Sequence, residues 1–381
     1  MAARKAHVVG GGIAGMAVAA CLARRKWDVT VHERSSELRE IGAGIFLKEN
    51  SLRVLEELDC YDSVMRRSHR IKHTFINDRP GHYLRRFSYG PERVVTILRA
   101  DIHRELADAA TKWGAKILLG SQVTRVSPTG MVATSSREER ADLVIGADGI
   151  RSTVRQQSGL ETSARPMGSG STRVIIPRKE GDTIDTSGEY WRGHKRVLVA
   201  PVSKDIIYLC ASSREDDQRG AAVPFDLAYW SGAFPELSDY FSRITPGIGI
   251  HHLHEYIKVS GWHRGRIVLI GDAAHGQPPN LGQGAGMAIS NGQALARELD
   301  RTPDVEMALK NWEREFKKFT LQVQNWSIGW EYCMHRWPLA FEGLRAHAVM
   351  VLANFPPTSR HWKRVYRGVQ SDDSTGASQG A

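Results

Sequence analysis

Three glycines near the N-terminus are spaced as in a phosphate-binding loop. Gly10, Gly12 and Gly15 match the pattern G-x-G-x-x-G, between the apolar run KAHVV and small apolar residues at helical spacing. The first glycine allows a tight turn, the second lets the backbone approach a pyrophosphate, and the third allows close packing of a helix on a strand. Glu33 follows 23 residues after Gly10, where an acid can bind a ribose hydroxyl. The pattern predicts a dinucleotide site, and a purely structural turn is the alternative.

Two later segments also place an acid beside glycines at the end of an apolar run. GADGIRSTVR contains Asp148 and Gly149, and GDAAHGQPPNLGQGAG contains Asp272 ahead of a glycine-rich stretch. An acid at a strand end can accept hydrogen bonds from sugar-like hydroxyls, and the two prolines fix the turn because proline locks φ. A helix that starts in glycines leaves its first backbone amides uncovered by side chains, and the helix dipole favours negative charge there. A glycine-capped structural turn is the alternative for this segment.

The surrounding pattern predicts the elements that position these residues. Residues 5–9 and 28–34 read as strands joined by a helix, which implies a parallel sheet with a right-handed crossover. Residues 99–114 read as an amphipathic helix closed by a glycine. Segments from about 170 to 258 read as strands of an antiparallel sheet, and residues 266–271 return to the first sheet. We therefore predict an α/β fold with a Rossmann-like domain, an inserted, mostly antiparallel β-sheet domain and C-terminal helices.

The same reading divides the chain into parts. We predict a discontinuous cofactor-binding domain over 1–70, 98–165 and 262–300 and a substrate-binding domain over 71–97 and 166–261. Residues 301–366 form a C-terminal helical region in this reading. The polar, glycine-rich residues 367–381 are predicted to be a disordered tail.

Composition limits the classes of partner. The 381 residues are 41% hydrophobic and 25% charged, and no apolar run approaches the roughly 18 residues of a membrane-spanning helix. The formal charge of +10 comes from dispersed basic residues with acids among them, which favours a positive funnel for a small anion over a nucleic-acid surface. Four scattered cysteines and the lack of a signal peptide favour the cytoplasm. The sequence carries no signal for an oligomeric state.

The three motifs, in this order, resemble one enzyme family. GGGIAG with HER, then GADGIRSTVR, then GDAAHGQPPNLGQG, over residues 5 to 300, are similar to the class A flavoprotein aromatic hydroxylases, the para-hydroxybenzoate and salicylate hydroxylase group. A nicotinamide dehydrogenase would share only the first motif. The resemblance implies that FAD is bound, that NADH or NADPH reduces it, and that dioxygen then hydroxylates an aromatic ring. Where the family often has an acidic pair, this chain has Ser290 and Asn291, so we expect altered helix packing there.

The resemblance also assigns cofactor-binding residues. The ADP half of FAD would be held by the glycine loop and the acid after the second strand, namely Gly10, Gly12, Gly15, Glu33 and Arg34. The pyrophosphate, ribityl chain and flavin ring would be served by the other motifs, namely Arg99, Asp148, Gly149, Asp272, Gly282, Gly284 and Ala285.

Within the family, the chain most resembles a ring-opening oxygenase of a hydroxypyridine carboxylate. That resemblance implies that the substrate is bound by Arg173, Arg196, Tyr208, Phe46 and Pro279. Arg196 would bind a carboxylate bidentately, and Tyr208 would hydrogen-bond the ring hydroxyl and favour its ionised form; these two are the candidate catalytic residues. Phe46 stands where that relative has a tyrosine, so one polar contact is missing. A solvated arginine and a core tyrosine are the alternatives.

Other polar and aromatic residues have simpler explanations. His275 is expected to support the motif around Asp272, and His252 with His254 lack a further ligand for a metal site. Trp191 and Trp230 could wall the ring pocket or pack in the core. The function predicted is an FAD-dependent monooxygenase of a hydroxylated N-heteroaromatic acid, with or without ring opening. A hydroxylase of a benzenoid acid, a non-oxygenating flavin dehydrogenase or reductase and a non-catalytic flavin protein are the alternatives.

Overall fold

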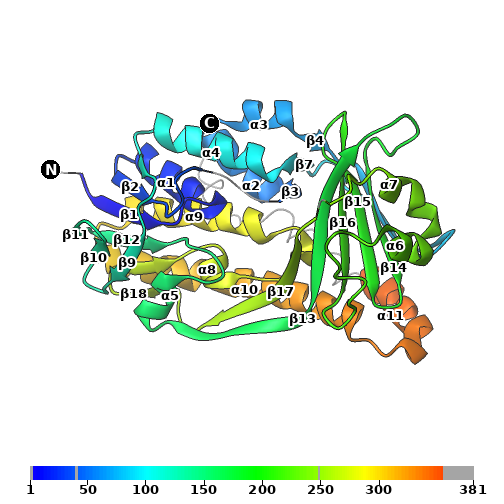
Figure 1. Ribbon diagram of the computed structural model, residues 1–381. Coiled ribbons are helices and arrows are strands. Elements are labelled where there is room, and N and C mark those ends of the chain that lie inside the picture. The colour runs from blue at the N-terminus through cyan, green and yellow to red at the C-terminus, as the bar shows by residue number, and fades with distance from the viewer. Residues whose placement is uncertain (1–2, 39–41, 248, 355–381) are drawn as a thin grey trace, which may run out of the picture.

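A computed structural model describes residues 3–38, 42–247 and 249–354. A six-stranded sheet lies in the half of the molecule that holds the N-terminus (Figure 1). Its strands, in spatial order, are β18 (His263–Arg264), β19 (Ile267–Leu269), β12 (Leu143–Gly146), β1 (Lys5–Val9), β2 (Asp28–His32) and β8 (Lys116–Leu118). All neighbours are parallel except β18 and β19. The predicted return of residues 266–271 to this sheet is confirmed.

Helices cover this first sheet. The helix α1 (Ile13–Arg24) is composed of small and apolar residues and is buried around most of its circumference, as expected of a helix that is apolar all round. It packs against α4 (Arg99–Lys112) and α9 (Gly284–Arg301). The other elements of this half are α2 (Glu49–Glu57), α3 (Tyr61–Arg67), α5 (Thr153–Ser158), α8 (Asp272–His275), the small sheet β3 (Gly44–Lys48), β7 (Val94–Leu98) and β4 (His69–Arg70), and the small sheet β9 (Val123–Val126), β10 (Met131–Thr134) and β11 (Glu138–Arg140).

A seven-stranded sheet forms the other half. Its order is β17 (His251–Val259), β13 (Glu161–Pro177), β16 (Ile206–Arg214), β15 (Lys195–Pro201), β14 (Thr186–Arg192), β5 (His73–Arg79) and β6 (His82–Ser88). Neighbours are antiparallel except β14 and β5. One face carries Val197, Val199 and Leu209, and packs against α6 (Leu227–Ala233) and α7 (Ser238–Ser242) at the outer end of the molecule (Figure 1). The opposite face is therefore turned toward the first half.

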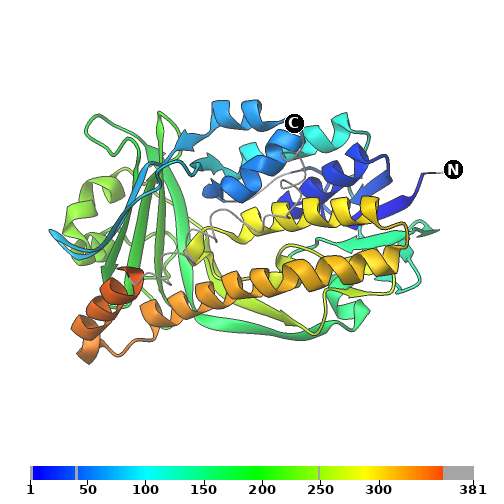
Figure 2. The same cartoon turned by 180° about the vertical axis from the view of Figure 1, so that it is seen from behind.

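The two halves are joined along their length by long elements. The strands β13 and β17 run from one half to the other (Figure 1). The 31-residue helix α10 (Val305–His335) runs beside α9 and on to the second sheet, and α11 (Glu342–Asn354) packs near β6 (Figure 2). Short 3-10 turns lie at Pro235–Leu237, Pro279–Leu281 and Leu339–Phe341.

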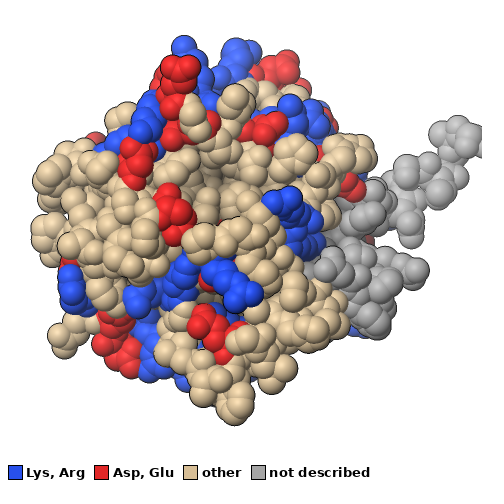
Figure 3. All heavy atoms as spheres, turned by 90° about the vertical axis from the view of Figure 1, so that its right-hand side faces the viewer, with Lys and Arg blue, Asp and Glu red and all other residues tan. Residues whose placement is uncertain are grey.

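The predicted fold class is confirmed, including the mostly antiparallel second sheet and the C-terminal helices. The domain boundaries stay a prediction, and the predicted tail at 367–381 lies outside the described residues. On the end of the molecule seen in Figure 3, acidic and basic side chains are interspersed. No helix within the described residues is long and apolar enough to cross a membrane.

Candidate active site

The three sequence motifs meet at the carboxyl ends of neighbouring parallel strands. Gly10 follows β1, and a Cβ built on it would lie 2.5 Å from the Ala147 carbonyl oxygen and 2.8 Å from the Asp148 Cα. A Cβ on Gly271, which follows β19, would lie 2.7 Å from the Cβ of Ala14 in α1. Ligands of open α/β sheets bind at such strand ends. The fold therefore gathers the motifs into one place although they are far apart in sequence.

The glycine loop has the close packing that the G-x-G-x-x-G pattern predicts. A Cβ on Gly15 would lie 1.9 Å from the Gly10 carbonyl oxygen, so only glycine fits there. Gly12 is the residue at which α1 begins, with extended backbone. The carboxylate of Glu33 accepts hydrogen bonds from the backbone amides of Gly11 and Ser35, both at 2.8 Å. These bonds fix the carboxylate at the end of β2, next to the glycine loop.

The second motif is held by its own hydrogen bonds. Asp148 accepts from the Ser152 hydroxyl at 2.5 Å and from the Val154 amide at 3.1 Å, so its carboxylate covers the start of α5. The buried Arg155 guanidinium donates to the Ile150 carbonyl at 2.6 Å and to the Ala273 carbonyl at 3.1 Å. Arg155 thereby ties the second motif to the third.

The third motif contains the starts of two helices, with space beside the start of the second one. Asp272, at the start of α8, is exposed, and Gly284 and the half-buried Ala285 begin α9. Of the described atoms, none lies within 4 Å of a Cβ built on Gly149 or on Gly284, so there is space above both. The space beside Gly284 lies at the N-terminus of α9, where the helix dipole favours negative charge. A dinucleotide that ends in a flat redox ring fits this arrangement.

Two basic residues assigned to the cofactor lie at different depths. Arg99 is half-buried at the start of α4, and its Cδ would be 2.9 Å from a Cβ on Gly42. Arg34 is exposed directly after Glu33.

A cavity lies between the third motif and the second sheet. It brings together four residues predicted for this region, Phe46, Arg196, Pro279 and Gly282, with the other lining residues Lys48, Thr74, Phe75, Ile76, Arg85, Tyr89, Ser187, Glu189, Leu198, Asn280, Leu281 and Trp330. A Cβ on Gly282 would lie 3.3 Å from the Phe46 Cβ, so the glycine lets the loop approach β3 closely. The lining is aromatic on several sides and contains three cationic side chains and one carboxylate.

Arg196 is buried and already has a carboxylate partner within the protein. Its Nη2 donates to Glu189 Oε2 at 2.9 Å, its Nε lies 2.9 Å from Glu189 Oε1, and its Nη1 donates to Asn280 Oδ1 at 2.7 Å. Glu189 also accepts from the Trp191 indole at 2.7 Å. The bidentate contact predicted between Arg196 and a substrate carboxylate is thus occupied by Glu189 in this structure.

The other two predicted substrate residues lie farther along the same sheet face. Arg173 is in register with Cys210, and Cys210 with Leu198, so Arg173 and Tyr208 share the face of Arg196. Tyr208 is buried, its Cδ1 would lie 2.9 Å from a Cβ on Gly44, and burial raises its pKa. Their predicted roles in binding and catalysis stay predictions.

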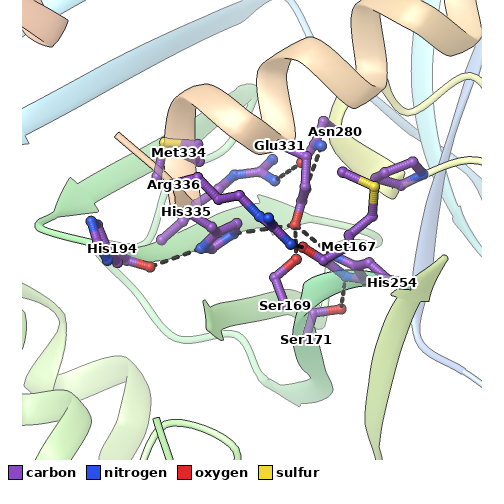
Figure 4. A network of polar contacts seen from close by, with 12 residues as sticks. Met167, Ser169, Ser171, His194, His254, Asn280, Glu331, Met334, His335 and Arg336 are labelled. Carbon is purple, nitrogen blue, oxygen red and sulfur yellow. Dashed lines mark hydrogen bonds and ion pairs between the residues drawn. The ribbon is translucent and has the colours of Figure 1, made fainter. Parts of the chain in front are cut away.

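A buried polar network lies behind the cavity (Figure 4). Glu331 of α10 points between Asn280 on one side and Ser169 and His254 on the other. Asn280 Nδ2 donates to Glu331 Oε2 at 2.5 Å, the Ser169 hydroxyl donates to Glu331 Oε1, and His254 Nδ1 lies 2.8 Å from the same oxygen. His335 Nε2 is 3.5 Å from Glu331 Oε1. Through Asn280, this network supports Arg196 in the cavity.

The helix α10 also holds the proline-rich loop directly. Gln324 Nε2 donates to the carbonyls of Ile257 and Gly276, both at 2.9 Å, and the Ser327 hydroxyl donates to the Pro278 carbonyl at 2.5 Å. At the place of the family's acidic pair, buried Asn291 contacts His275 Nε2 at 3.3 Å and Thr320 Oγ1 at 3.1 Å. His275 is itself buried under the motif.

The remaining tryptophans and histidines considered in the sequence analysis lie on both faces of the seven-stranded sheet. Trp230 belongs to α6 and packs in the core on the far face of the second sheet, whereas Trp191 makes an edge contact with Trp330, which lines the cavity. His252 is exposed, and His254 on the same strand face is buried against Glu331. A group of three or more metal-ligating side chains that could hold an ion is not found within the described ranges.

Sequence reasoning missed several residues of this region, and some carried a signal. Lys48 ends an otherwise apolar strand segment, and Asn280 lies inside the third motif itself. On α10, Thr320, Gln324, Ser327 and Glu331 are buried at spacings of three and four residues, a polar stripe at helical period. Such a stripe indicates a buried polar contact, although it does not name the partner.

Burial of histidines predicts a loss of stability in mild acid. Burial lowers the pKa of His275 to about 4, below the ordinary value near 6.5, and His335 behaves alike. Below about pH 6.5 the unfolded chain binds protons that the folded chain does not bind. The free energy of unfolding should therefore fall as pH drops from about 6.5 to 4, by up to about 3 kcal/mol for each histidine.

Urea unfolding of the flavin-bound protein over this pH range measures the slope. His275→Gln should flatten the pH dependence, whereas His73→Gln, at an exposed position, should leave it unchanged. A free energy of unfolding that stays constant from pH 6.5 to 4 would contradict the assignment.

Comparison with known proteins defines the class to which this site belongs. The family model of the FAD binding domain matches residues 4–303, and the chain belongs to that family. The similar proteins within this family are FAD-dependent monooxygenases of the class A aromatic hydroxylase type. The predicted family, the FAD cofactor and the enzyme class are therefore confirmed.

Three similar proteins illustrate the range of activities named within this family. A putative 2-heptyl-3-hydroxy-4(1H)-quinolone synthase of Rhodococcus erythropolis is 33% identical over 85% of this chain and 87% of its own. A 6-hydroxynicotinate 3-monooxygenase of Bordetella bronchiseptica is 28% identical over 77% of this chain and 82% of its own. The solved structure of 2-methyl-3-hydroxypyridine-5-carboxylic acid oxygenase in its tetrameric form is 30% identical, covers 97% of this chain and 99% of that one, and has a TM-score of 0.84.

The cofactor that the family implies fits the residues present. The loop at Gly10–Gly15 and Glu33 suit the ADP half, and the open amides at Gly284 suit the flavin ring. When bound, FAD supplies the redox chemistry that activates dioxygen. The protein's own part is to orient the ring, to exclude water and to place charges in the cavity beside Gly282.

Proposed function

We propose that this FAD-dependent monooxygenase uses NADH or NADPH and dioxygen to hydroxylate a hydroxylated N-heteroaromatic acid. A hydroxypyridine carboxylate is the representative substrate, and hydroxylation proceeds with or without opening of the ring. Cytoplasmic localisation is part of the same proposal. The observation that carries it is the cavity beside Gly282, which combines aromatic walls with three basic side chains and one carboxylate. Arg196 is paired with Glu189, and Lys48 and Arg85 are the other basic side chains of the lining.

The charge balance of the cavity supports an anionic ring. Beyond the Arg196–Glu189 pair, the lining adds two basic side chains, Arg85 and Lys48, and these favour a carboxylate or an ionisable hydroxyl over a substrate without an acidic group. The names of two relatives, which refer to a hydroxynicotinate and a hydroxypyridine carboxylate, point to the same class of ring.

A 4-quinolone is the second candidate. The quinolone synthase named above has a higher sequence identity to this chain, 33%, than the hydroxynicotinate enzyme, 28%. Phe75, Tyr89 and Trp330 offer apolar surface for a fused ring. This candidate makes less use of the cationic lining.

Substrate-stimulated turnover of the purified flavin-bound protein tests the proposal. The panel contains 6-hydroxynicotinate, 2-methyl-3-hydroxypyridine-5-carboxylate, salicylate and a 2-alkyl-4(1H)-quinolone, each with NADH and with NADPH. We expect a pyridine carboxylate to stimulate oxidation of the nicotinamide and uptake of dioxygen, and to yield a product that mass spectrometry shows to have gained oxygen. Stimulation by salicylate or the quinolone alone would favour those substrates, and reductant consumption without an oxygenated product would favour a reductase.

A further inference from the structure

Lys48 is a buried basic residue in the wall of the cavity beside Gly282. It is the last residue of β3 and is only 5% exposed. Its Nζ donates to the Leu281 carbonyl oxygen at 2.6 Å, within the loop that leads to Gly282 and the open start of α9. A lysine rarely lies this deep in a protein, because removing an ammonium from water is costly.

The charges that share the cavity with Lys48 come from three other strands. Arg85 lies on β6, and Arg196 and Glu189 lie on β15 and β14, where they form an ion pair with each other. The phenol of Tyr89 is the remaining titratable group of the lining. Arg196 and Glu189 pair with each other, and Arg85 is the basic group of the lining whose charge acts on Lys48.

We propose that Lys48 is a substrate-binding residue that accepts the proton of the ring hydroxyl and holds the resulting oxyanion. This inference rests on the proposed function and deepens it, because it assigns to Lys48, which lines the cavity, the ionisation of the ring hydroxyl that the family resemblance implied for Tyr208. In the step, the O–H bond of the ring breaks and an N–H bond forms on the neutral Lys48 amine. The products are an ammonium and a ring oxyanion side by side, and no electrons are exchanged with any other reagent.

The protonation state of Lys48 suits this step. Burial, and after it the charge of Arg85, lower the pKa of Lys48 to about 7, from an ordinary value near 10.4. Near neutral pH a substantial fraction of the side chain is therefore a neutral amine that can accept a proton. An oxyanion beside it then favours the ammonium form and raises the pKa again. An ionised hydroxyl makes the ring more electron-rich, as attack by an electrophilic oxygen requires.

The alternative is that Lys48 only supports the loop through the Leu281 carbonyl. Two variants separate these roles. Lys48→Met keeps length and apolar bulk and removes both the charge and the donor, whereas Lys48→Gln keeps a donor and removes the titratable amine. Lys204→Met is the matched control, since that side chain is 89% exposed and is absent from the lining of the cavity.

The experiment is a binding titration of the flavin-bound proteins, followed by flavin fluorescence and by the ultraviolet band of the ligand. The probes are 6-hydroxynicotinate and 2-methyl-3-hydroxypyridine-5-carboxylate, over a pH series that crosses neutrality. In the native protein we expect the bound ring to show the spectrum of its ionised form at pH values where the free ligand is neutral at the hydroxyl. Both Lys48 variants should bind the un-ionised ring, about 10- to 100-fold more weakly, while their flavin content stays native.

The outcomes distinguish the two proposals. Binding by Lys48→Gln that equals the native protein in affinity and spectrum would make Lys48 a loop support and overturn the inference, while the proposed function stands. Native protein that binds both probes un-ionised would also overturn it. If the native protein binds neither probe, the proposed substrate class fails and the inference fails with it.

Discussion

Gly15→Ala should strip the protein of flavin and destabilise it by about 3 kcal/mol, at the upper end of what overpacking costs. The new Cβ would lie 1.9 Å from the Gly10 carbonyl oxygen and 3.1 Å from its carbonyl carbon, far inside contact distance. The obstacle is backbone, so no side chain can turn away to make room. Either α1 moves off β1 or the turn at Gly10 opens, and both displace the amides that would face the pyrophosphate. The ratio of flavin to protein absorbance after gel filtration and the midpoint of chemical unfolding measure the two effects.

Gly329→Ala is the matched control for this substitution. Gly329 lies inside α10, and none of the described atoms would lie within 4 Å of its Cβ. Because alanine has the higher helix propensity, this variant should keep its flavin and gain up to about 1 kcal/mol of stability. Native flavin content in Gly15→Ala would show that the loop does not hold the cofactor in the way described.

Glu331→Ala should destabilise the protein by about 3–5 kcal/mol, the usual loss when one partner of a buried charged network is removed. The carboxylate is 1% exposed, and its loss leaves Asn280, Ser169 and His254 without their shared acceptor. Asn280 also accepts from Arg196, so the wall of the cavity should loosen as well. Urea unfolding measures the stability, and quenching of flavin fluorescence by 6-hydroxynicotinate measures the cavity.

Two further variants sharpen this prediction. Glu331→Gln keeps the size and one acceptor of the side chain but not its charge, so its loss should be intermediate. Glu315→Ala changes an exposed carboxylate on the same helix and should alter stability by less than about 0.5 kcal/mol. If Glu331→Ala were as stable as Glu315→Ala, the network would contribute nothing to stability.

The parts of the structure that sequence predicted are those determined by short stretches of chain. The unit formed by β1, α1 and β2 spans about 30 residues, and its glycines and Glu33 indicate the local backbone structure directly. The same holds for α4, which ends just before Gly114, and for the start of α9 at Gly284. The motifs are specific because close approach to a pyrophosphate and to a flat ring leaves few alternatives to glycine.

The cavity was harder to predict because distant segments build it. The parallel pairing of β14 with β5 brings residues of the first hundred next to Glu189 and Arg196, and no local pattern specifies that register. Arg196 lines the cavity and donates to Asn280 of the loop, but its pairing with Glu189 on the neighbouring strand was missed, and its predicted role in substrate binding stays a prediction. The buried Lys48 was missed because a lysine at a strand end is ordinarily a solvated residue.

The position of α10 has a consequence for dissecting this protein. The matched FAD-binding segment ends at residue 303, yet Gln324 and Ser327 hold the carbonyls of Gly276 and Pro278 from outside it. A fragment that ends at residue 303 would keep every glycine of the FAD-binding motifs. It would lose the hydrogen bonds from Gln324 and Ser327 to the proline-containing loop. We therefore expect the excised segment to bind flavin poorly, although all of its glycine motifs are intact.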